Sequence, residues 1–253
     1  NPKGIKIING KIELKNVSFK YRNSDILALD DVSFKVNNKE SIGIVGVTGS
    51  GKSSLIKLIT RIYNCDYGEI LVDDKKITEF DIENYRKQIG VVPQDSFLFS
   101  DSIINNIRFG KEEATLDEVR KICKITGIHN EIMKFSNGYD SILGERGINL
   151  SGGQKQRICI ARALIKNPKI LILDDCLSAL DTETEKKIIQ SLSKYKNKTT
   201  KMIVSHRLSS VKDLDKIIVL SSGKIIQIGN HEQLINEKGY YKELYFKQIN
   251  KKD

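Results

Sequence analysis

Apolar and polar residues alternate along the N-terminal part of the chain, through Lys11–Tyr21 and Leu29–Val36. Alternation of this length is typical of half-buried strands, so it predicts an antiparallel layer of strands. The repeating apolar positions are Ile12, Leu14, Val32, Phe34 and Val36.

A different pattern follows. Ser41–Val47 is nearly all apolar and runs into a glycine-rich turn, and Ser53–Ile62 then carries apolar residues at helical spacing. These helical positions are Leu55, Ile56, Ile59 and Ile62. A strand, a glycine turn and a helix in this order predict the opening of a parallel α/β unit.

From Gln94 to about Asn167 the pattern becomes helical. Thr115 with Glu118 predicts a capping box at the start of one helix. Ser151 with Gln154 predicts a second capping box, whose helix ends before Asn167-Pro168. This stretch is therefore expected to be a helical insert.

Strand patterns resume at Lys169–Leu173, Lys201–Val204 and Ile217–Leu220. Ser222-Gly223 then predicts a hairpin to a further strand, Ile225–Ile228. Between the first two strands, a helix is expected from about Thr182 to Tyr195, with Ile188, Ile189 and Leu192 on one face.

The composition is that of an ordinary globular protein, with 39% hydrophobic and 29% charged residues in a chain of 253. The longest apolar runs fall far short of the roughly 20 residues that span a bilayer. The start, Asn1-Pro2-Lys3-Gly4, has no initiator Met and no signal sequence, so we read it as the inside of a longer protein.

The net charge of +10 raises the question of nucleic-acid binding. The lysines are scattered and no DNA- or RNA-binding motif accompanies them, so no nucleic-acid partner is expected. Cysteines 65, 123, 159 and 176 have no Cys-x-x-Cys spacing, which favours free thiols in a reducing compartment.

The chemistry begins in the glycine-rich turn, which matches G-x-x-x-x-G-K-[ST]. Glycines let successive backbone N–H groups point at phosphate oxygens, and the following helix turns its positive end to the same place. Lys52 would contact the β- and γ-phosphates, and Ser53 would ligate Mg²⁺. The expected nucleotide-binding residues here are Gly46, Val47, Thr48, Gly49, Ser50, Gly51, Lys52, Ser53 and Ser54.

Two further features point to the same nucleotide chemistry. Asp174 ends an apolar strand, where α/β sheets place ligands, although without the phosphate loop it would read as a helix cap or turn residue. A capped helix start with two glycines is an anion site, and one α/β core cannot easily bring a second such site to the same nucleotide. The second site consists of Leu150, Ser151, Gly152, Gly153 and Gln154. We therefore expect this second site to contact a nucleotide that another copy of the chain holds.

With these motifs in this order, nearly the whole chain resembles the nucleotide-binding domain of an ABC transporter of the exporter type. The resemblance implies ATP and Mg²⁺ as ligands and a head-to-tail dimer around two ATP molecules. Tyr21 would stack on adenine, Gln94 would sense magnesium and water, and His206 would read the γ-phosphate. Asp174 would join Ser53 and Gln94 around the metal. A loop communicating between the two sites would consist of Ser178, Ala179, Leu180 and Asp181.

The resemblance also implies the fold and the setting. The expected fold class is α/β, with a P-loop NTPase core around a mixed or parallel sheet, an N-terminal antiparallel β layer and an inserted helical subdomain. Residues 1–253 would form one ABC ATPase domain, with its core at about 1–93 and 168–253 and the subdomain at about 94–167. A transmembrane domain of the same full-length chain would hold it at the cytoplasmic face of a membrane.

One position departs from the family pattern. Active members usually carry Glu after the magnesium-associated aspartate, as general base, and here the residue is Asp175. Asp at this place is common in the weakly hydrolysing half of heterodimeric exporters, and we expect this chain to be such a half. The alternatives are a homodimeric exporter in which Asp175 works, a soluble ABC ATPase, and a regulatory module without useful turnover. The exporter-like segment Gly144–Gly147, which resembles a contact with the membrane domain, argues against the soluble ATPase.

Overall fold

The computed structural model describes residues 8–22, 24–194 and 199–250. They form two compact units, which we describe separately. The first contains the described residues up to Arg86 and from Thr199 onward, and the second contains those from Lys87 to Lys194. The limits expected for the helical subdomain, near 94 and 167, fall inside the second unit and stay a prediction.

The first unit contains the expected antiparallel layer. Its strands β1 (Ile12–Lys20), β2 (Leu27–Val36), β4 (Tyr67–Val72) and β5 (Lys75–Lys76) lie in the order β2-β1-β4-β5. Ile12 lies opposite both Val36 and Val72, and all three are fully buried. The alternating apolar positions thus face one interior, as the sequence pattern predicts.

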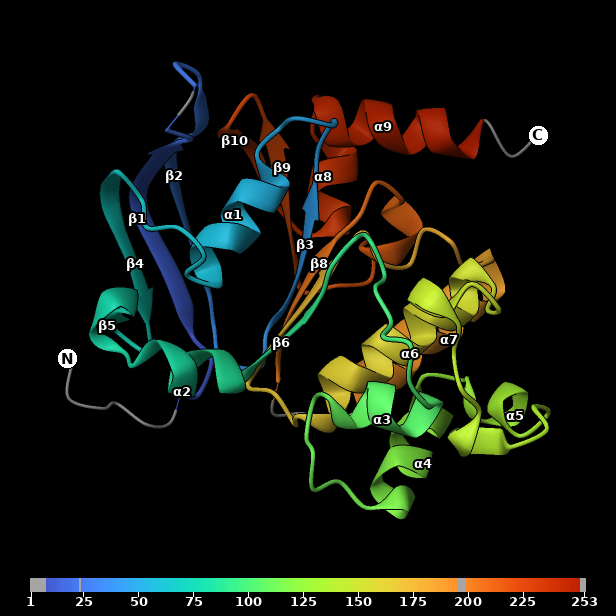
Figure 1. The fold of residues 1–253 in the computed structure, drawn as a ribbon. Coiled ribbons are helices and arrows are strands. Elements are labelled where there is room, and N and C mark those ends of the chain that lie inside the picture. Colours follow the sequence, from blue (N-terminus) through green and yellow to red (C-terminus); the bar gives the residue numbers. More distant parts are fainter. Residues whose placement is uncertain (1–7, 23, 195–198, 251–253) are drawn as a thin grey trace. The chain divides into compact units, whose positions relative to one another are not determined.

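A second set of strands in this unit supports the ligand-binding loop. Strand β3 (Ser41–Val45) lies between β8 (Thr200–Val204) and β9 (Lys216–Ser221), parallel to both. β10 (Lys224–Gly229) returns antiparallel to β9 through the predicted hairpin. Helix α1 (Lys52–Ile59) lies between the antiparallel layer and β3 (Figure 1).

Two predicted elements of the first unit are too long at their C-terminal ends. Strand β3 ends at Val45 because the chain turns at Gly46, whose φ is 157°. Helix α1 ends at Ile59, three residues before the predicted end. There the Thr60 hydroxyl donates to the Ile56 carbonyl oxygen, and Arg61 adopts a left-handed conformation with φ 56°.

Helices α8 (His231–Asn236) and α9 (Tyr240–Ile249) of the first unit were not predicted, and they pack against each other. Helix α2 (Ile82–Lys87), which ends at the boundary between the units, was not predicted either. Short 3₁₀ helices span Ile77–Glu79 and Leu208–Ser210. Helix α8 begins with a capping box between Asn230 and Gln233.

The second unit surrounds helix α6 (Gly152–Ile165), which packs against α3 (Ile103–Arg108), α4 (Leu116–Ile125) and the strand β6 (Ile89–Val92). β6 is parallel to β7 (Ile170–Asp174). The unit also contains α5 (His129–Ile132), α7 (Thr182–Lys194) and short 3₁₀ helices at Gly138–Asp140 and Glu145–Gly147. Both predicted capping boxes are confirmed, and the predicted helix end at Tyr195 lies outside the described residues.

Strands β4, β5 and β6 were also missed by the sequence analysis. A Cβ at Gly90 would lie 3.0 Å from the Ala163 carbonyl oxygen, which shows how closely β6 approaches α6. All four cysteines carry free thiols, as expected. Among the described residues, no helix combines the length and the apolar character that a membrane span needs.

Candidate functional site

The glycine-rich segment connects β3 to α1, and Lys52 opens that helix. The Lys52 Nζ donates to the carbonyl oxygens of Gly46 at 2.9 Å and Val47 at 2.8 Å, and to the Ser50 hydroxyl at 3.3 Å. The residue is only 7% exposed. The loop therefore curls around a cationic amino group, which lies where an anion approaching the start of α1 would meet it.

Two glycines are required by the path of this loop. A Cβ at Gly46 would lie 2.2 Å from the Leu220 carbonyl oxygen. Gly51 has φ 104°, and a Cβ there would lie 2.5 Å from the Ala28 carbonyl oxygen. Both contacts are with backbone atoms that cannot rotate away, so any side chain would displace the loop.

The predicted hairpin turn supports the loop from outside. The Gly223 N–H donates to the Ser50 carbonyl oxygen at 3.1 Å, and the Gly223 carbonyl oxygen accepts from the Asp30 N–H at 2.9 Å. The turn thereby links the loop to β2. The β9–β10 hairpin and β2, which are far apart in the sequence, together hold the loop in one shape, which preorganises it for a ligand.

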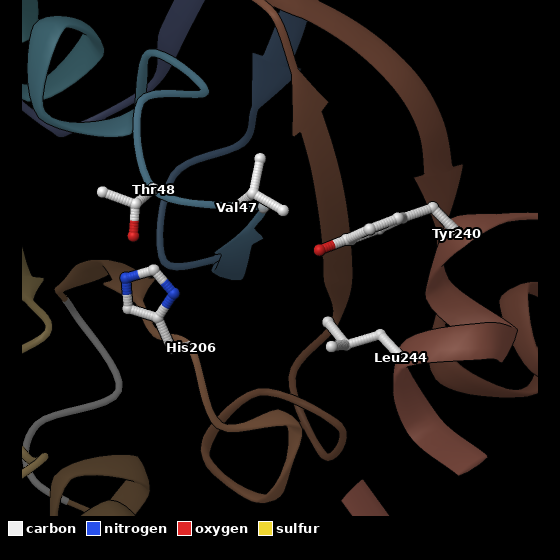
Figure 2. A pocket seen from close by; sticks show the side chains of 6 residues that line it. Val47, Thr48, His206, Tyr240 and Leu244 are labelled. Atoms are coloured by element: carbon white, nitrogen blue, oxygen red, sulfur yellow. The ribbon is translucent and has the colours of Figure 1, made fainter. Parts of the chain in front are cut away.

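A pocket of about 440 Å³ lies beside the loop. His206 belongs to its lining because β8 is parallel to β3, with Val204 opposite Ile44, so the segments that follow both strands emerge side by side. Figure 2 shows the imidazole beside Thr48 and the Tyr240 hydroxyl directed toward Val47. The lining residues are Gly46, Val47, Thr48, His206, Tyr240 and Leu244.

The sequence analysis expected His206 in the nucleotide site but missed Tyr240 and Leu244. Both come from α9, whose sequence shows no clear apolar face, so no local pattern marks them. Their arrival at the loop depends on the packing of a helix that lies almost 200 residues later in the chain.

Tyr21 lies next to the first helix, just after β1. Its hydroxyl and that of Ser54 are 3.0 Å apart, and the Lys57 Nζ lies 5.2 Å from the centre of its ring. The ring also meets Phe19 and Tyr63 edge-on, with centroids 5.0 and 5.6 Å apart. Tyr21 is thus a fixed aromatic side chain on the same unit as the loop.

In the second unit, the start of α6 is closed by a reciprocal cap. The Ser151 hydroxyl oxygen accepts from the Gln154 N–H at 3.2 Å, and the Gln154 Oε1 accepts from the Ser151 N–H at 2.9 Å. The hydroxyl accepts in this bond, so its own hydrogen can still be donated to an anion. Leu150, immediately before the cap, is buried.

The cap is braced by a residue that the sequence analysis missed. Glu131 accepts from the Gln154 Nε2 at 2.9 Å and from two Arg157 nitrogens at 2.6 and 3.0 Å. Partial burial alone raises the pKa of Glu131, but the bonds from Arg157 and Gln154 outweigh it and hold the pKa below its ordinary 4.5. The Gln154 amide is therefore engaged within its own chain at both ends.

The two glycines at the start of α6 allow a close contact with the loop Ser178–Asp181. A Cβ at Gly152 would lie 3.3 Å from the Ala179 Cβ, and one at Gly153 would lie 3.1 Å from the Leu180 Cδ2. The Gln156 side chain accepts from the Ala179 N–H at 3.2 Å. Two segments with separate expected roles thus lie directly against each other.

The carboxylates of the second unit have distinct settings. Asp174 ends β7, as the sequence predicts. Asp175 adopts the left-handed conformation with φ 44°, and its carbonyl oxygen accepts from the Ser178 hydroxyl at 2.9 Å. Asp181 caps α7, and its bonds from the Thr184 and Glu183 N–H groups lower its pKa. Gln94 is exposed and follows β6 by two residues.

A divalent cation at the phosphate loop would need ligands other than a cluster of carboxylates. Within the described part of the chain, no three His, Cys, Asp or Glu side chains gather to hold a metal ion. Ser53 is exposed in the first turn of α1, next to the lysine. A single hydroxyl fits Mg²⁺, which usually takes few protein ligands and completes its shell with phosphate oxygens and water.

Comparison with known proteins agrees with this arrangement. Residues 29–178 match the family model described as ABC transporter. The chain belongs to the ABC transporter family. It is 47% identical, over 96% of its length, to the uncharacterized ABC transporter ATP-binding protein YfiB of Bacillus subtilis strain 168, and covers 42% of that protein. It is 48% identical over 94% of its length to the multidrug resistance-like ATP-binding protein MdlA of Buchnera aphidicola, and covers 41% of it.

Among solved structures, a bacterial Atm1-family ABC exporter with ATP bound matches 98% of this chain, with a TM-score of 0.94 and 38% identity. The chain covers 44% of that exporter, so it spans less than half the length of each of these three proteins. The expected family is confirmed. So is the fold class, an α/β fold with an antiparallel layer, a mixed sheet and a helical insertion.

Proposed function

We propose that this chain is the ATP-binding and ATP-hydrolysing domain of a membrane exporter. One observation carries the proposal: a loop that the β9–β10 hairpin supports wraps the Lys52 amino group at the start of α1. A buried lysine amino group at the positive end of a helix suits a triphosphate.

Within the first unit, we assign a role to each part of the nucleotide. The loop and Lys52 would hold the phosphates, Ser53 would ligate Mg²⁺, and Tyr21 would stack on adenine. His206 would meet the γ-phosphate, because it lines the pocket beside Thr48. Bound Mg²⁺ would neutralise phosphate charge and polarise the bond to be broken.

The second unit would act on a nucleotide held by another copy or by a related domain. The segment Leu150–Gln154 offers a helix N-terminus and a hydroxyl hydrogen but no cation. Two domains arranged head to tail would each complete the site of the other. Gln94, Asp174, Asp175 and the loop Ser178–Asp181 keep the roles that the family resemblance implies.

We assign export to the full-length protein because a structural neighbour is an exporter and MdlA is described as multidrug resistance-like. The chain covers less than half of these proteins, and the remaining length is where a transmembrane domain would lie. The domain would then act at the cytoplasmic face of a membrane. No nucleic acid enters this proposal.

Asp175 favours a specific version of the function, in which this chain is the slowly hydrolysing half of a heterodimeric exporter. A homodimeric exporter with a working Asp175 is the second candidate. The soluble ABC ATPase and the regulatory module have less support, because the solved neighbour is an exporter with ATP bound.

Replacement of Lys52 tests nucleotide binding. Lys52→Ala should raise the Kd for Mg-ATP by about 100-fold, because the triphosphate loses a charge-assisted contact at the centre of the loop. Lys121→Ala, an exposed lysine of α4 in the second unit, is the matched control and should leave the Kd unchanged. Titration with a fluorescent ATP analogue measures both. Equal affinities in the two variants would show that the loop is not the binding site.

A further inference from the structure

The C-terminal helix α9 meets the nucleotide pocket at two points. Near its start it supplies Tyr240 and Leu244 to the pocket lining. Near its end, Gln248 reaches the segment that carries His206. The Gln248 Nε2 donates to the His206 carbonyl oxygen at 2.7 Å, and the Gln248 Oε1 accepts from the Leu208 N–H at 2.9 Å.

A glutamine amide suits this contact because it presents one donor and one acceptor side by side. The backbone groups it meets are a carbonyl oxygen and an N–H two residues apart. Within the same segment, the Ser205 hydroxyl oxygen accepts from the Arg207 N–H at 3.0 Å. The main chain around His206 is thus held by Ser205 of the segment itself and by Gln248 of α9.

Helix α9 is itself firmly placed. The Gln227 side chain of β10 accepts from the Tyr241 N–H at 3.0 Å. The Tyr241 ring is fully buried, and its hydroxyl lies 2.8 Å from the His231 Nδ1. Gln248 therefore lies on a helix with a fixed position, and its two hydrogen bonds fix the main chain at His206 and Leu208 relative to that helix.

We propose that Gln248 is a positioning residue for His206 and sets where the imidazole meets the γ-phosphate. The proposal rests on the proposed function. His206 is exposed and lies in the loop after β8, so the position of its backbone sets the point from which the imidazole can reach a phosphate. A displacement of about 1 Å at such a group can lower a rate by about 100-fold.

The test uses two substitutions of Gln248 and a neighbouring control. Gln248→Ala removes both bonds and keeps a good helix former. Gln248→Glu keeps the size and the acceptor but sets a carboxylate against the His206 carbonyl oxygen. Lys247→Ala changes the exposed preceding residue. If Gln248 acted only by packing, the glutamate variant would behave like the unaltered chain, whereas we expect it to be at least as impaired as the alanine variant.

The first measurement is NMR of the imidazole protons, since the chain has only three histidines. The His206 signal, assigned with His206→Ala, should shift with Mg-ATP and differ from its position with Mg-ADP. That difference should shrink at least twofold in both Gln248 variants and persist in Lys247→Ala. The Kd for Mg-ATP should stay within about twofold in all forms, because the phosphate loop is untouched.

The second measurement is steady-state phosphate release, in which kcat should fall about 10-fold in both Gln248 variants with little change in KM. An unchanged His206 response in the Gln248 variants, or a loss confined to KM, would overturn the proposal. So would a shifted His231 signal in those variants, because it would mean that the whole helix had been released. If His206 in the unaltered chain ignores Mg-ATP and Lys52→Ala binds normally, the proposed function fails as well.

Discussion

At the scale of single residues, the backbone conformation of residue 175 favours an aspartate at this position. Its φ of 44° lies in the left-handed region, which costs most residues with a Cβ about 1–2 kcal/mol. Aspartate is enriched there because its short side chain can bond locally. A glutamate at this position would gain reach but lose part of that compatibility. Two properties of Asp175 therefore need separate tests: the short reach of its side chain as a base, and the left-handed backbone that suits an aspartate.

Substitution of Asp175 separates these effects. The carboxylate of Asp lies roughly 1.5 Å short of that of Glu, one bond length of the side chain. If Asp175 is an ill-placed base, Asp175→Glu should raise turnover by about 10- to 100-fold. It should also destabilise the domain by about 1 kcal/mol through the left-handed backbone. Phosphate release measured over a range of protein concentrations tests the first effect, and urea unfolding tests the second.

Asp175→Asn completes the series and should change little, since the site is already slow. A brisk unaltered domain that Asp175→Asn silences and Asp175→Glu does not improve would identify Asp175 as a competent base. The homodimeric exporter would then be the better interpretation.

At the scale of elements, the sequence predicted those with a clear period or a complete cap. β1 alternates, α6 carries a full capping box, and both formed as expected. α9 was missed because aromatic and charged residues follow each other in Tyr240–Ile249 without a stripe, and only Tyr241 is buried. β6 was missed because Ile89–Val92 is only four residues long.

The same distinction applies to the candidate site. The phosphate loop and the α6 cap are contiguous motifs, so their residues could be found from spacing alone. Glu131 and Gln248 act through partners at least 23 and 40 residues away in sequence, respectively. No local pattern marks such residues, because their roles exist only once tertiary packing has brought the segments together.

Glu131 gives a prediction for the α6 start. Glu131→Ala removes the carboxylate that Gln154 and Arg157 share and leaves the nearly buried Arg157 without this acceptor. We expect a loss of about 2 kcal/mol in the free energy of unfolding at pH 7, as for hydrogen bonds to charged groups. Glu183→Ala, which breaks the exposed pair with Lys187, is the control and should cost under about 0.5 kcal/mol. Urea unfolding measures the free energy of unfolding of both variants. Equal losses of unfolding free energy would contradict a stabilising role for the Glu131 contacts with Gln154 and Arg157.

The brace should also depend on pH in a definite direction. The pKa of Glu131 is lowered on folding, so its contribution is full above its ordinary value of 4.5 and is lost as the pH falls through the folded value. The difference in unfolding free energy between the unaltered chain and Glu131→Ala should therefore be constant from pH 7 to about 5.5 and should shrink below pH 4.5. A difference that grows on acidification would rule out the ionised carboxylate as the source.

At the scale of the whole molecule, the chain presents two helix starts suited to anions, and they differ in strength. The start of α1 includes the amino group of Lys52, whereas the capping segment Leu150–Gln154 of α6 contains no cationic residue, and Arg157 of the next turn is paired with Glu131. A helix N-terminus by itself contributes only about 0.3–1 kcal/mol to an exposed anion. The α6 start therefore suits a nucleotide that is already held by another domain, and pairing should require bound ATP.

The last prediction concerns this pairing and relies on a substitution that preserves the fold. Ser151→Asp keeps the cap, since Asp is as good an N-cap as Ser, but it adds a negative charge where the γ-phosphate of the partner would arrive. Any ATP-dependent dimer should disappear, while each monomer should still bind Mg-ATP with a Kd within about twofold of normal, because the phosphate loop is unchanged. Thr115→Asp at the exposed cap of α4 is the matched control and should leave both properties intact. Light scattering with and without Mg-ATP follows the dimer, and a fluorescent ATP analogue reports the Kd. A Ser151→Asp monomer that no longer binds ATP would place the α6 start in the site of its own chain, and a dimer that survives the added charge would remove it from the interface.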